Sequence, residues 1–205
     1  MKIAAPWDAR ALIAFSPPQR GEGGRRPDEG FFTETELATA NAFKLASRRE
    51  EWLLVRIAAK QLAMQLGLAK DPRAIVIDRP SLIIDGVRSE WHVSLSHSAP
   101  YAAAAVDRRP IGIDIEHLRE LDERAAHLFL TPDEIEQMQS CTLAHRILHF
   151  WSAKEAAWKQ RSEEFVTLRQ VPLQLVEERG DGLLFDIVES VSVGDAIAAI
   201  TLPTS

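Results

Sequence analysis

The chain has 205 residues, of which 46% are hydrophobic and 26% charged, a composition typical of a folded globular protein. Its formal net charge of −6 offers no basic surface for a nucleic acid backbone, so we expect no nucleic acid partner. The single cysteine, Cys141, cannot form an intrachain disulfide, and we identify neither a signal peptide nor an apolar run of membrane-spanning length. The sequence therefore predicts a cytoplasmic protein that does not associate with a membrane.

The first third of the chain predicts strands, a loop and a long helix. Apolar residues within 3–15 favour one or two strands, and the Pro- and Gly-rich stretch 17–27 favours a loop. Apolar residues at helical spacing from about 34 to 68 predict a single helix that Gly67 ends. Short strands are expected at 74–77 and 82–84.

The predicted helix carries a row of arginines, Arg48, Arg49 and Arg56. Arg56 follows Arg49 by seven residues, which is two turns along one helical face. Such a row suits an anionic ligand, but a solvated face paired with Glu50 and Glu51 would give the same pattern.

A strand predicted at 91–95 runs directly into Ser96 and His97. Hydroxyl, imidazole and backbone N–H groups at a strand end can bind phosphate, or the side chains can cap their own turn. The next apolar run, 101–106, predicts a strand that we expect to pair antiparallel with the following one across a turn at 107–110.

That following strand is IGIDIE, residues 111–116, in which apolar and other residues alternate strictly. Asp114 and Glu116 project from the same face roughly 7 Å apart, and their repulsion favours a divalent cation or water between them. Gly112 on this face would let a ligand or another backbone approach closely. Ordinary solvent-facing acids would produce the same alternation.

Two helices are predicted after this strand. Thr131, Pro132 and Glu134 form a capping-box start, and a second helix is expected over 143–159. Glu155 and Lys159 lie one turn apart on it, as in a simple salt bridge. His145 and His149 share a helical face, but no HExxH pattern supports zinc. Further on, residues 183–202 predict two strands.

Three motifs, VSLSHS at 93–98, IGIDIE at 111–116 and FWSAKEAAWK at 150–159, occur in this order. Together they resemble the signature of the 4'-phosphopantetheinyl transferases of the surfactin-synthetase-activating (Sfp) type, closely over 79–161 and more loosely over the arginine helix. The resemblance implies an α+β pseudo-dimer of two similar lobes, each a small antiparallel-rich sheet packed on a long helix. The lobes would be 1–108 and 109–205, with the cofactor in the cleft between them.

The resemblance also implies an activity. Such enzymes transfer the phosphopantetheine arm of coenzyme A to a serine of an apo acyl or peptidyl carrier protein, release adenosine 3',5'-bisphosphate and use Mg²⁺. A monomer is expected. The implied magnesium ligands are Asp114, Glu116 and Glu155. The implied contacts to coenzyme A are Arg48, Arg49, Arg56, Arg79, Ser96, His97, Lys154 and Lys159. Arg79 stands where the family commonly has lysine, and the two cations differ in geometry.

The proton of the carrier serine would pass to Glu155, to a metal-bound water or to Lys159. Residues 128–130 and 131–140 are possible carrier-docking elements.

Two other functions would fit parts of the pattern. One is a catalytically silent module that binds coenzyme A or a carrier. The retained Glu155 and Lys159 argue against this function. The other is a metal-dependent phosphodiesterase that removes the arm.

Overall fold

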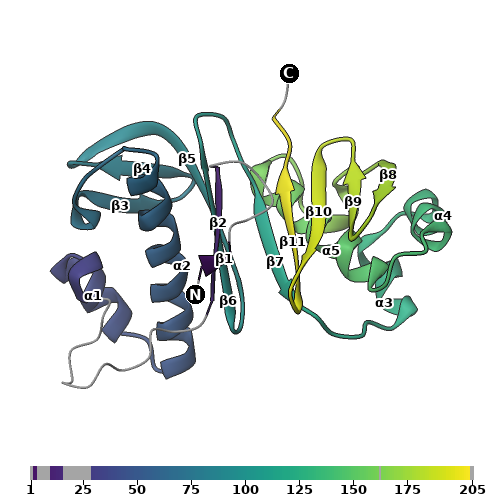
Figure 1. Ribbon diagram of the computed structural model, residues 1–205, viewed down its shortest axis with the longest axis horizontal. Coiled ribbons are helices and arrows are strands. Elements are labelled where there is room, and N and C mark those ends of the chain that lie inside the picture. Colours follow the sequence, from purple (N-terminus) through teal and green to yellow (C-terminus); the bar gives the residue numbers. More distant parts are fainter. Residues whose placement is uncertain (1, 4–9, 16–28, 162, 204–205) are drawn as a thin grey trace. The chain divides into compact units, whose positions relative to one another are not determined.

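The computed structural model describes residues 2–3, 10–15, 29–161 and 163–203, and the chain divides into two units, Met1–Arg109 and Pro110–Ser205. Each unit is an antiparallel sheet with a long helix packed on it (Figure 1), which confirms the predicted α+β class. The loop predicted at 17–27 lies outside the described residues. Among the described helices, none is long and apolar enough to cross a lipid bilayer.

The sheet of the first unit has the strand order β1-β2-β6-β5-β4-β3. Its strands are β1 (Lys2–Ile3), β2 (Ala11–Phe15), β3 (Ile75–Asp78), β4 (Ser81–Ile84), β5 (Val87–Ser98) and β6 (Tyr101–Asp107). Helix α2 (Ala46–Gln65) packs across this sheet and buries Val55 and Leu62 against Val93 and Ala104. The small side chains of the alanine run 102–105 are fully buried and let the helix approach the sheet closely.

The single helix predicted over 34–68 is wrong, because two helices occupy it: α1 (Glu34–Asn41) and α2. The chain leaves helical geometry at 42–45, where Phe43 packs against Trp52 with ring centroids 6.2 Å apart. Buried Lys60 donates a 2.7 Å hydrogen bond to Glu36 and so ties α1 to α2. Tertiary packing therefore breaks the helix where the sequence has neither Gly nor Pro. Gly67, at φ +75°, ends α2 as predicted.

The predicted pairing of the strand at 101–106 with the acidic strand is also wrong. Both edges of β6 are occupied, one by β2 and the other by β5, so β6 has no free edge. The acidic strand, β7 (Ile113–His117), belongs to the other sheet and pairs with β11 (Ala196–Thr201).

The sheet of the second unit has the order β7-β11-β10-β9-β8. Its remaining strands are β8 (Leu175–Arg179), β9 (Gly182–Phe185) and β10 (Val188–Val193). A hairpin turn at 194–195 joins β10 to β11, with Gly194 at φ +64°. The expectation of two strands over 183–202 falls short, because residues 183–185 belong to β9 and a further strand, β8, precedes it.

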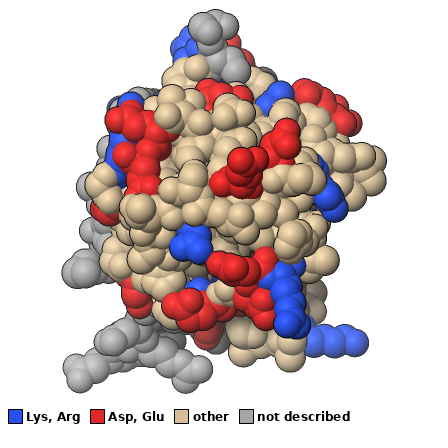
Figure 2. All heavy atoms as spheres, turned by 90° about the vertical axis from the view of Figure 1, so that its right-hand side faces the viewer, with Lys and Arg blue, Asp and Glu red and all other residues tan. Residues whose placement is uncertain are grey.

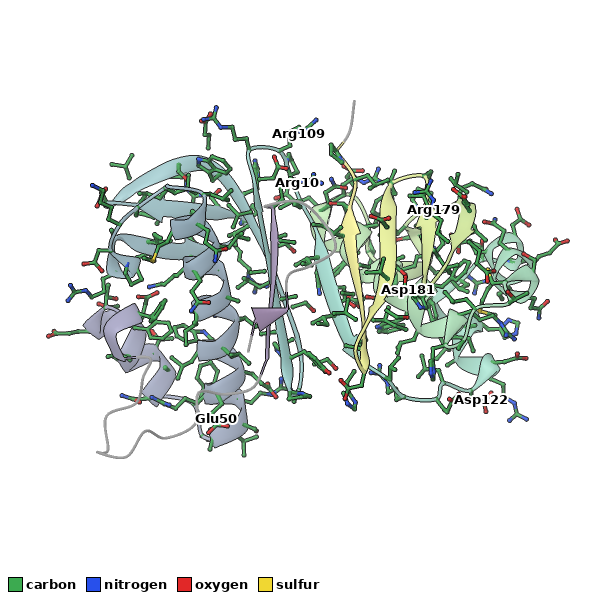
Figure 3. The ribbon with its side chains drawn as sticks, viewed as in Figure 1. Arg10, Glu50, Arg109, Asp122, Arg179 and Asp181 are labelled. Atoms are coloured by element: carbon green, nitrogen blue, oxygen red, sulfur yellow. The ribbon has the colours of Figure 1, made fainter. Side chains whose placement is uncertain are left out.

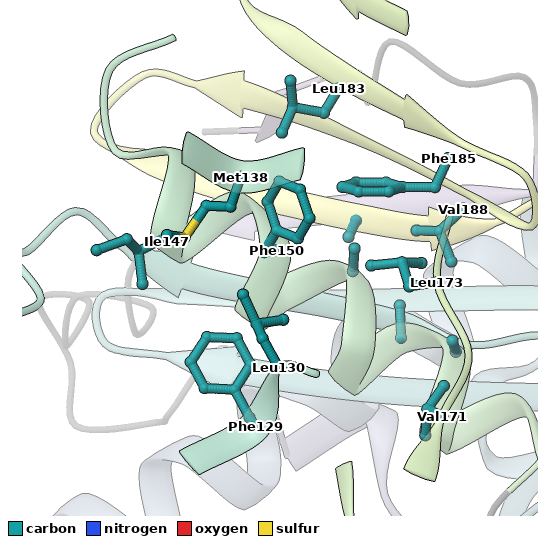
Figure 4. Close-up of a cluster of buried hydrophobic side chains, with 14 of the residues drawn as sticks. Phe129, Leu130, Met138, Ile147, Phe150, Val171, Leu173, Leu183, Phe185 and Val188 are labelled. Atoms are coloured by element: carbon teal, nitrogen blue, oxygen red, sulfur yellow. The ribbon is translucent and has the colours of Figure 1, made fainter. Parts of the chain in front are cut away.

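Helix α5 (Arg146–Gln160) covers this sheet, with α3 (Glu123–Phe129) and α4 (Pro132–Ser140) packed against it. Three short 3₁₀ helices complete the described elements: η1 (Glu29–Phe31), η2 (Pro72–Ala74) and η3 (Leu168–Gln170). Phe150 of α5 meets Phe185 of β9 edge to face at 4.9 Å in the centre of the core (Figure 4).

Capping residues set where the shorter helices of this unit begin. Thr131 forms the predicted capping box with Glu134 at the start of α4. Asp122, labelled in Figure 3, caps α3 by accepting a 2.8 Å hydrogen bond from the backbone N–H of Arg124. Each cap satisfies N–H groups that have no partner within the helix.

The two histidines of α5 do not form a metal pair. His149 is fully buried, with Nδ1 at 2.5 Å from Ser190 Oγ and Nε2 at 3.4 Å from Ser192 Oγ. His145 lies at the start of the helix, and its Nδ1 is 3.6 Å from Glu120. Burial lowers the pKa of His149 to about 4, so the ring is neutral at physiological pH.

This buried histidine predicts a loss of stability in acid. The unfolded state takes up a proton below about pH 6.5, whereas the folded ring stays neutral to about pH 4. From pH 6.5 to pH 5 the free energy of unfolding should therefore fall by about 2 kcal/mol more in the wild type than in His149→Gln. Urea unfolding at several pH values measures this difference. Between pH 8 and pH 7 the two slopes should agree, and equal slopes below pH 6.5 as well would contradict the prediction.

Candidate active site

The acidic strand β7 lies against helix α5, and Gly112 marks their closest approach. A Cβ atom at Gly112 would stand 1.8 Å from the carbonyl oxygen of Ala156, so no other residue fits without displacing the helix. The close approach predicted for this glycine is thus that of the α5 backbone. It brings the side chains of α5 within hydrogen-bonding distance of the carboxylates on β7.

Asp114 is almost fully buried, and two residues of α5 hold its carboxylate. The hydroxyl of Ser152 donates to Oδ2 at 2.9 Å, and the ammonium of Lys159 donates to Oδ1 at 2.6 Å. Lys159 also donates to the carbonyl of Ile113 at 3.2 Å. These donors compensate for the removal of the charge from water.

Glu116 is held by two further donors. The indole N–H of Trp151 donates to Oε1 at 2.9 Å, and Arg119 donates to Oε2 at 2.6 Å. Trp151 is itself fixed by an edge-to-face contact with Phe129, 5.0 Å between centroids. Trp151, like Ser152 and Lys159, therefore orients a carboxylate of β7 from α5.

Glu155 is the third carboxylate, and it is half-buried on α5. Burial raises its pKa, as do the negative charges of Asp114 and Glu116, while Lys159 acts in the opposite direction. The simple Glu155–Lys159 salt bridge considered from the sequence is not among the ion pairs of the described residues, because Lys159 bonds to Asp114 instead. Three mutually repelling carboxylates and one lysine thus gather between β7 and α5.

Lys154, the other lysine of the motif, lies away from solvent. Its side chain is fully buried, and its ammonium donates to Glu134 at 2.6 Å and to the carbonyl of Val171. The lysine therefore ties α5 to the start of α4. This arrangement supports a structural role rather than contact with a ligand.

In the first unit, Arg56 and Arg79 lie close enough for their charges to interact. Burial lowers the pKa of Arg56 to about 10, and the positive charge of Arg79 contributes to the shift. The Arg56 guanidinium stays charged at neutral pH and lies over the ring of Trp52 at 3.7 Å. Neighbouring guanidiniums repel each other, so an anion between them would be stabilising.

The other cationic residues of α2 have local partners. Arg48 pairs with Glu51 at 3.1 Å, and Arg49 donates to Asn41 at 3.1 Å. His97 also faces α2, with Nδ1 3.9 Å from Glu51. Part of the arginine row is therefore the paired, solvated face that was the alternative prediction.

Ser96 and His97 are consecutive residues of β5, so their side chains point to opposite faces of the sheet. His97 shares the face of Val93 and Leu95, which pack against α2. Ser96 lies on the other face and is nearly buried. The two side chains therefore do not converge on one point, and only a backbone group of Ser96 could act beside the His97 imidazole.

Comparison with known proteins places the second unit in a family. Residues 110–183 match the 4'-phosphopantetheinyl transferase superfamily. The 4'-phosphopantetheinyl transferase psf-1 of Bacillus pumilus is 38% identical over 69 residues, which cover 32% of this chain and 30% of that protein. The 4'-phosphopantetheinyl transferase of Bacillus subtilis is 35% identical over 74 residues, 35% of this chain and 33% of the relative. Over residues 110–183 the chain is thus similar to the 4'-phosphopantetheinyl transferase superfamily.

A longer alignment joins the chain to enterobactin synthase component D of Escherichia coli (strain K12), 36% identical over 121 residues, 55% of this chain and 54% of the relative. The chain thus spans about a third to a half of the length of these relatives. The resemblance noted in the sequence is confirmed at the level of the superfamily and its Sfp-like type. The match to the superfamily includes all of β7 and α5, with the three carboxylates and Lys159.

The transferase superfamily implies magnesium, for which the three carboxylates are the candidate ligands. Hard oxygen donors on neighbouring elements suit Mg²⁺ chemically, and the charges of Asp114 and Glu116 add to the effect of burial in raising the pKa of Glu155. Within the described residues, however, no group of three His, Cys, Asp or Glu side chains is arranged as a metal cluster. Asp114 and Glu116 bond instead to Lys159, Ser152, Trp151 and Arg119. The chemistry of the three carboxylates suits Mg²⁺, and their use as a metal site is a proposal.

Two contributors to the candidate site were not predicted from the sequence, Ser152 and the indole N–H of Trp151. The sequence did contain a signal for Ser152, which is a polar residue with apolar Leu148 and Ala156 one helical turn away on either side. Such a hydroxyl must bond either to its own helix or to a facing element.

Proposed function

We propose that this protein transfers the 4'-phosphopantetheine arm of coenzyme A to a serine of an apo acyl or peptidyl carrier protein and releases adenosine 3',5'-bisphosphate. The observation that carries the proposal is the gathering of Asp114, Glu116, Glu155 and Lys159 between β7 and α5, in the segment that matches the superfamily. Relatives in Bacillus are named for this transfer.

In this proposal Asp114, Glu116 and Glu155 hold a Mg²⁺ ion. Bound there, the ion would neutralise charge on the pyrophosphate of coenzyme A as the bisphosphate leaves. Trp151 and Arg119 keep Glu116 oriented, as Ser152 does for Asp114. The residues that hold the ion are thus fixed by the fold before the ligand arrives.

The proposed general base is Glu155. Its carboxylate lies close enough to Asp114 and Glu116 to feel their charge, so beside a bound ion it would be placed to take the proton of the carrier serine, directly or through a metal-bound water. Lys159 was the alternative, but its side chain acts as a hydrogen-bond donor to Asp114 and Ile113 rather than as an acceptor. Lys159 is therefore better suited to binding a phosphate oxygen.

Coenzyme A would also bind the cations of the first unit. The proposed phosphate contacts are Arg56, Arg79 and His97. Arg48 and Arg49, which lie in the first turn of α2, would add positive charge, and Ser96 would contribute through its backbone. The repulsion between Arg56 and Arg79 supports this proposal, because a phosphate would relieve it. Lys154 is left out of the ligand set, because its ammonium is enclosed with Glu134.

Replacing Arg56 with alanine should weaken coenzyme A binding about 10- to 100-fold, the usual effect of losing a charged hydrogen bond. Isothermal titration of coenzyme A into each variant measures the dissociation constant. Arg73→Ala is the control, because Arg73 is an exposed arginine of the same unit that pairs with Asp71. Equal weakening in the two variants would contradict a specific role for Arg56.

The carrier is proposed to meet the enzyme away from the face of the second unit shown in Figure 2. On that face carboxylates form several clusters, with basic side chains between some of them. Carrier proteins are usually acidic around their modified serine, so this face would repel them. Docking at 131–140 is correspondingly less favoured, since its first helical turn carries Asp133. We also propose that the protein acts as a monomer in the cytoplasm.

Incubation with coenzyme A, Mg²⁺ and a panel of apo carriers tests the function directly. A transferase increases the mass of a carrier by the phosphopantetheine arm. A silent binding module would bind coenzyme A or carrier with no change in mass, and a phosphodiesterase would release the arm from a holo carrier. Either of these outcomes would overturn the proposal.

A further inference from the structure

The hydroxyl of Ser152 is completely enclosed between α5 and β7. A serine inside a helix commonly bonds back to the carbonyl of its own preceding turn. The Ser152 hydroxyl instead donates across to Oδ2 of Asp114 at 2.9 Å. The Ser152 side chain thus bonds to the facing strand β7 and not to its own helix.

Asp114 is held at both oxygens by residues seven apart on α5, which is two turns along the same face. The two donors differ in kind. Lys159 is long and partly exposed, so a competing cation can displace its ammonium. Ser152 is short and has no exposed surface, so its hydroxyl stays in place. Of these two donors to Asp114, Lys159 is therefore exchangeable and Ser152 is permanent.

A permanent partner of this kind matters where a carboxylate ligates a metal. Hydrogen bonds from outside the ligand shell fix the orientation of the ligating group, and their removal typically weakens metal binding or activity about 10- to 100-fold. Ser152 has the required position, because it contacts Asp114 and is not itself one of the proposed ligands.

We infer that Ser152 is a positioning residue, whose hydroxyl fixes the Asp114 carboxylate in the orientation that a divalent cation requires. The inference rests on the proposed function, since it supposes the metal site of Asp114, Glu116 and Glu155. It adds a residue that is neither a ligand nor a base, and that acts only through Asp114.

The test is a titration with Mn²⁺, followed by electron paramagnetic resonance, in the presence of saturating coenzyme A. Ser152→Ala should raise the dissociation constant of Mn²⁺ about 10- to 100-fold. Ser152→Thr, which keeps the hydroxyl, should restore most of the affinity. In the transfer assay the rate should be lowest for Ser152→Ala and closer to wild type for Ser152→Thr. A high metal concentration should recover part of the rate that Ser152→Ala loses.

Ser190→Ala is the matched control, because Ser190 is an equally buried serine that contacts α5 through His149 and not through Asp114. It should leave the Mn²⁺ dissociation constant unchanged, and urea unfolding of all variants separates metal affinity from stability. Equal affinities of Ser152→Ala and the wild type would overturn the inference, as would an equal weakening in Ser190→Ala. Wild-type protein that binds no Mn²⁺ would refute the metal site itself, and the inference with it.

Discussion

Replacing Glu155 with glutamine is expected to abolish phosphopantetheine transfer while the protein remains folded. The substitution keeps the size of the side chain and removes its negative charge, so it eliminates both a proposed magnesium ligand and the proposed base. Loss of a general base alone lowers rates about 10²- to 10⁴-fold. The mass increase of an apo carrier, followed over time, measures the effect.

The same substitution should leave stability unchanged or raise it. Burial raises the pKa of Glu155, which means that the folded state disfavours the ionised side chain relative to the unfolded chain. Asp114 and Glu116 add repulsion in the same direction. A neutral glutamine relieves both effects. Lost activity with undiminished stability is the pattern expected of a residue retained for function.

Glu136→Gln is the control, because Glu136 is an exposed glutamate on α4 in the same unit. It should retain wild-type transfer, with urea unfolding of both variants followed by tryptophan fluorescence. Near-wild-type transfer by Glu155→Gln would refute Glu155 as ligand and as base. A large loss of stability would instead show that its charge is needed for folding.

The parts of this site that the sequence predicts depend on local periodicity. Alternation in 111–116 places Asp114 and Glu116 on one strand face, and the helical spacing over 143–159 places Glu155 and Lys159 one turn apart. The close approach at Gly112 was also predicted, because only a residue without a side chain admits another backbone there. None of these conclusions depends on which residues from distant parts of the sequence lie beside the motif in the fold.

The parts that the sequence does not predict depend on distant partners. The pairing of β7 with β11 joins residues about 80 positions or more apart in the sequence, such as Asp114 and Ala199, whereas a short turn at 107–110 favoured the wrong neighbour. Lys159 bonds to Asp114 and not to Glu155 because the strand brings a buried carboxylate within reach. Lys154 matches the motif of the family, yet only the packing of α4 on α5 encloses its ammonium with Glu134.

Replacing Gly112 with alanine is expected to destabilise the second unit by about 3 kcal/mol or more, the upper range for overpacking. The added methyl group would lie 1.8 Å from the carbonyl oxygen of Ala156 and 3.0 Å from the backbone N of Gln160. Both atoms belong to the α5 backbone, which cannot rotate away as a side chain could. The strand and the helix must therefore separate.

Separation of β7 from α5 would also lengthen the hydrogen bonds from Ser152 and Lys159 to Asp114. Transfer should consequently fall even under conditions where Gly112→Ala is folded, and Mn²⁺ binding should weaken with it. Urea unfolding by tryptophan fluorescence reports the stability directly, because Trp151 and Trp158 both lie on α5.

Gly30→Ala provides the comparison, because a Cβ atom at Gly30 would meet nothing within 4 Å. Its free energy of unfolding should change by less than about 1 kcal/mol. Equal stabilities of the two alanine variants would show that α5 can move away from Gly112 at little cost. The fixed spacing between β7 and α5, on which the orientation of Asp114 depends, would then be refuted.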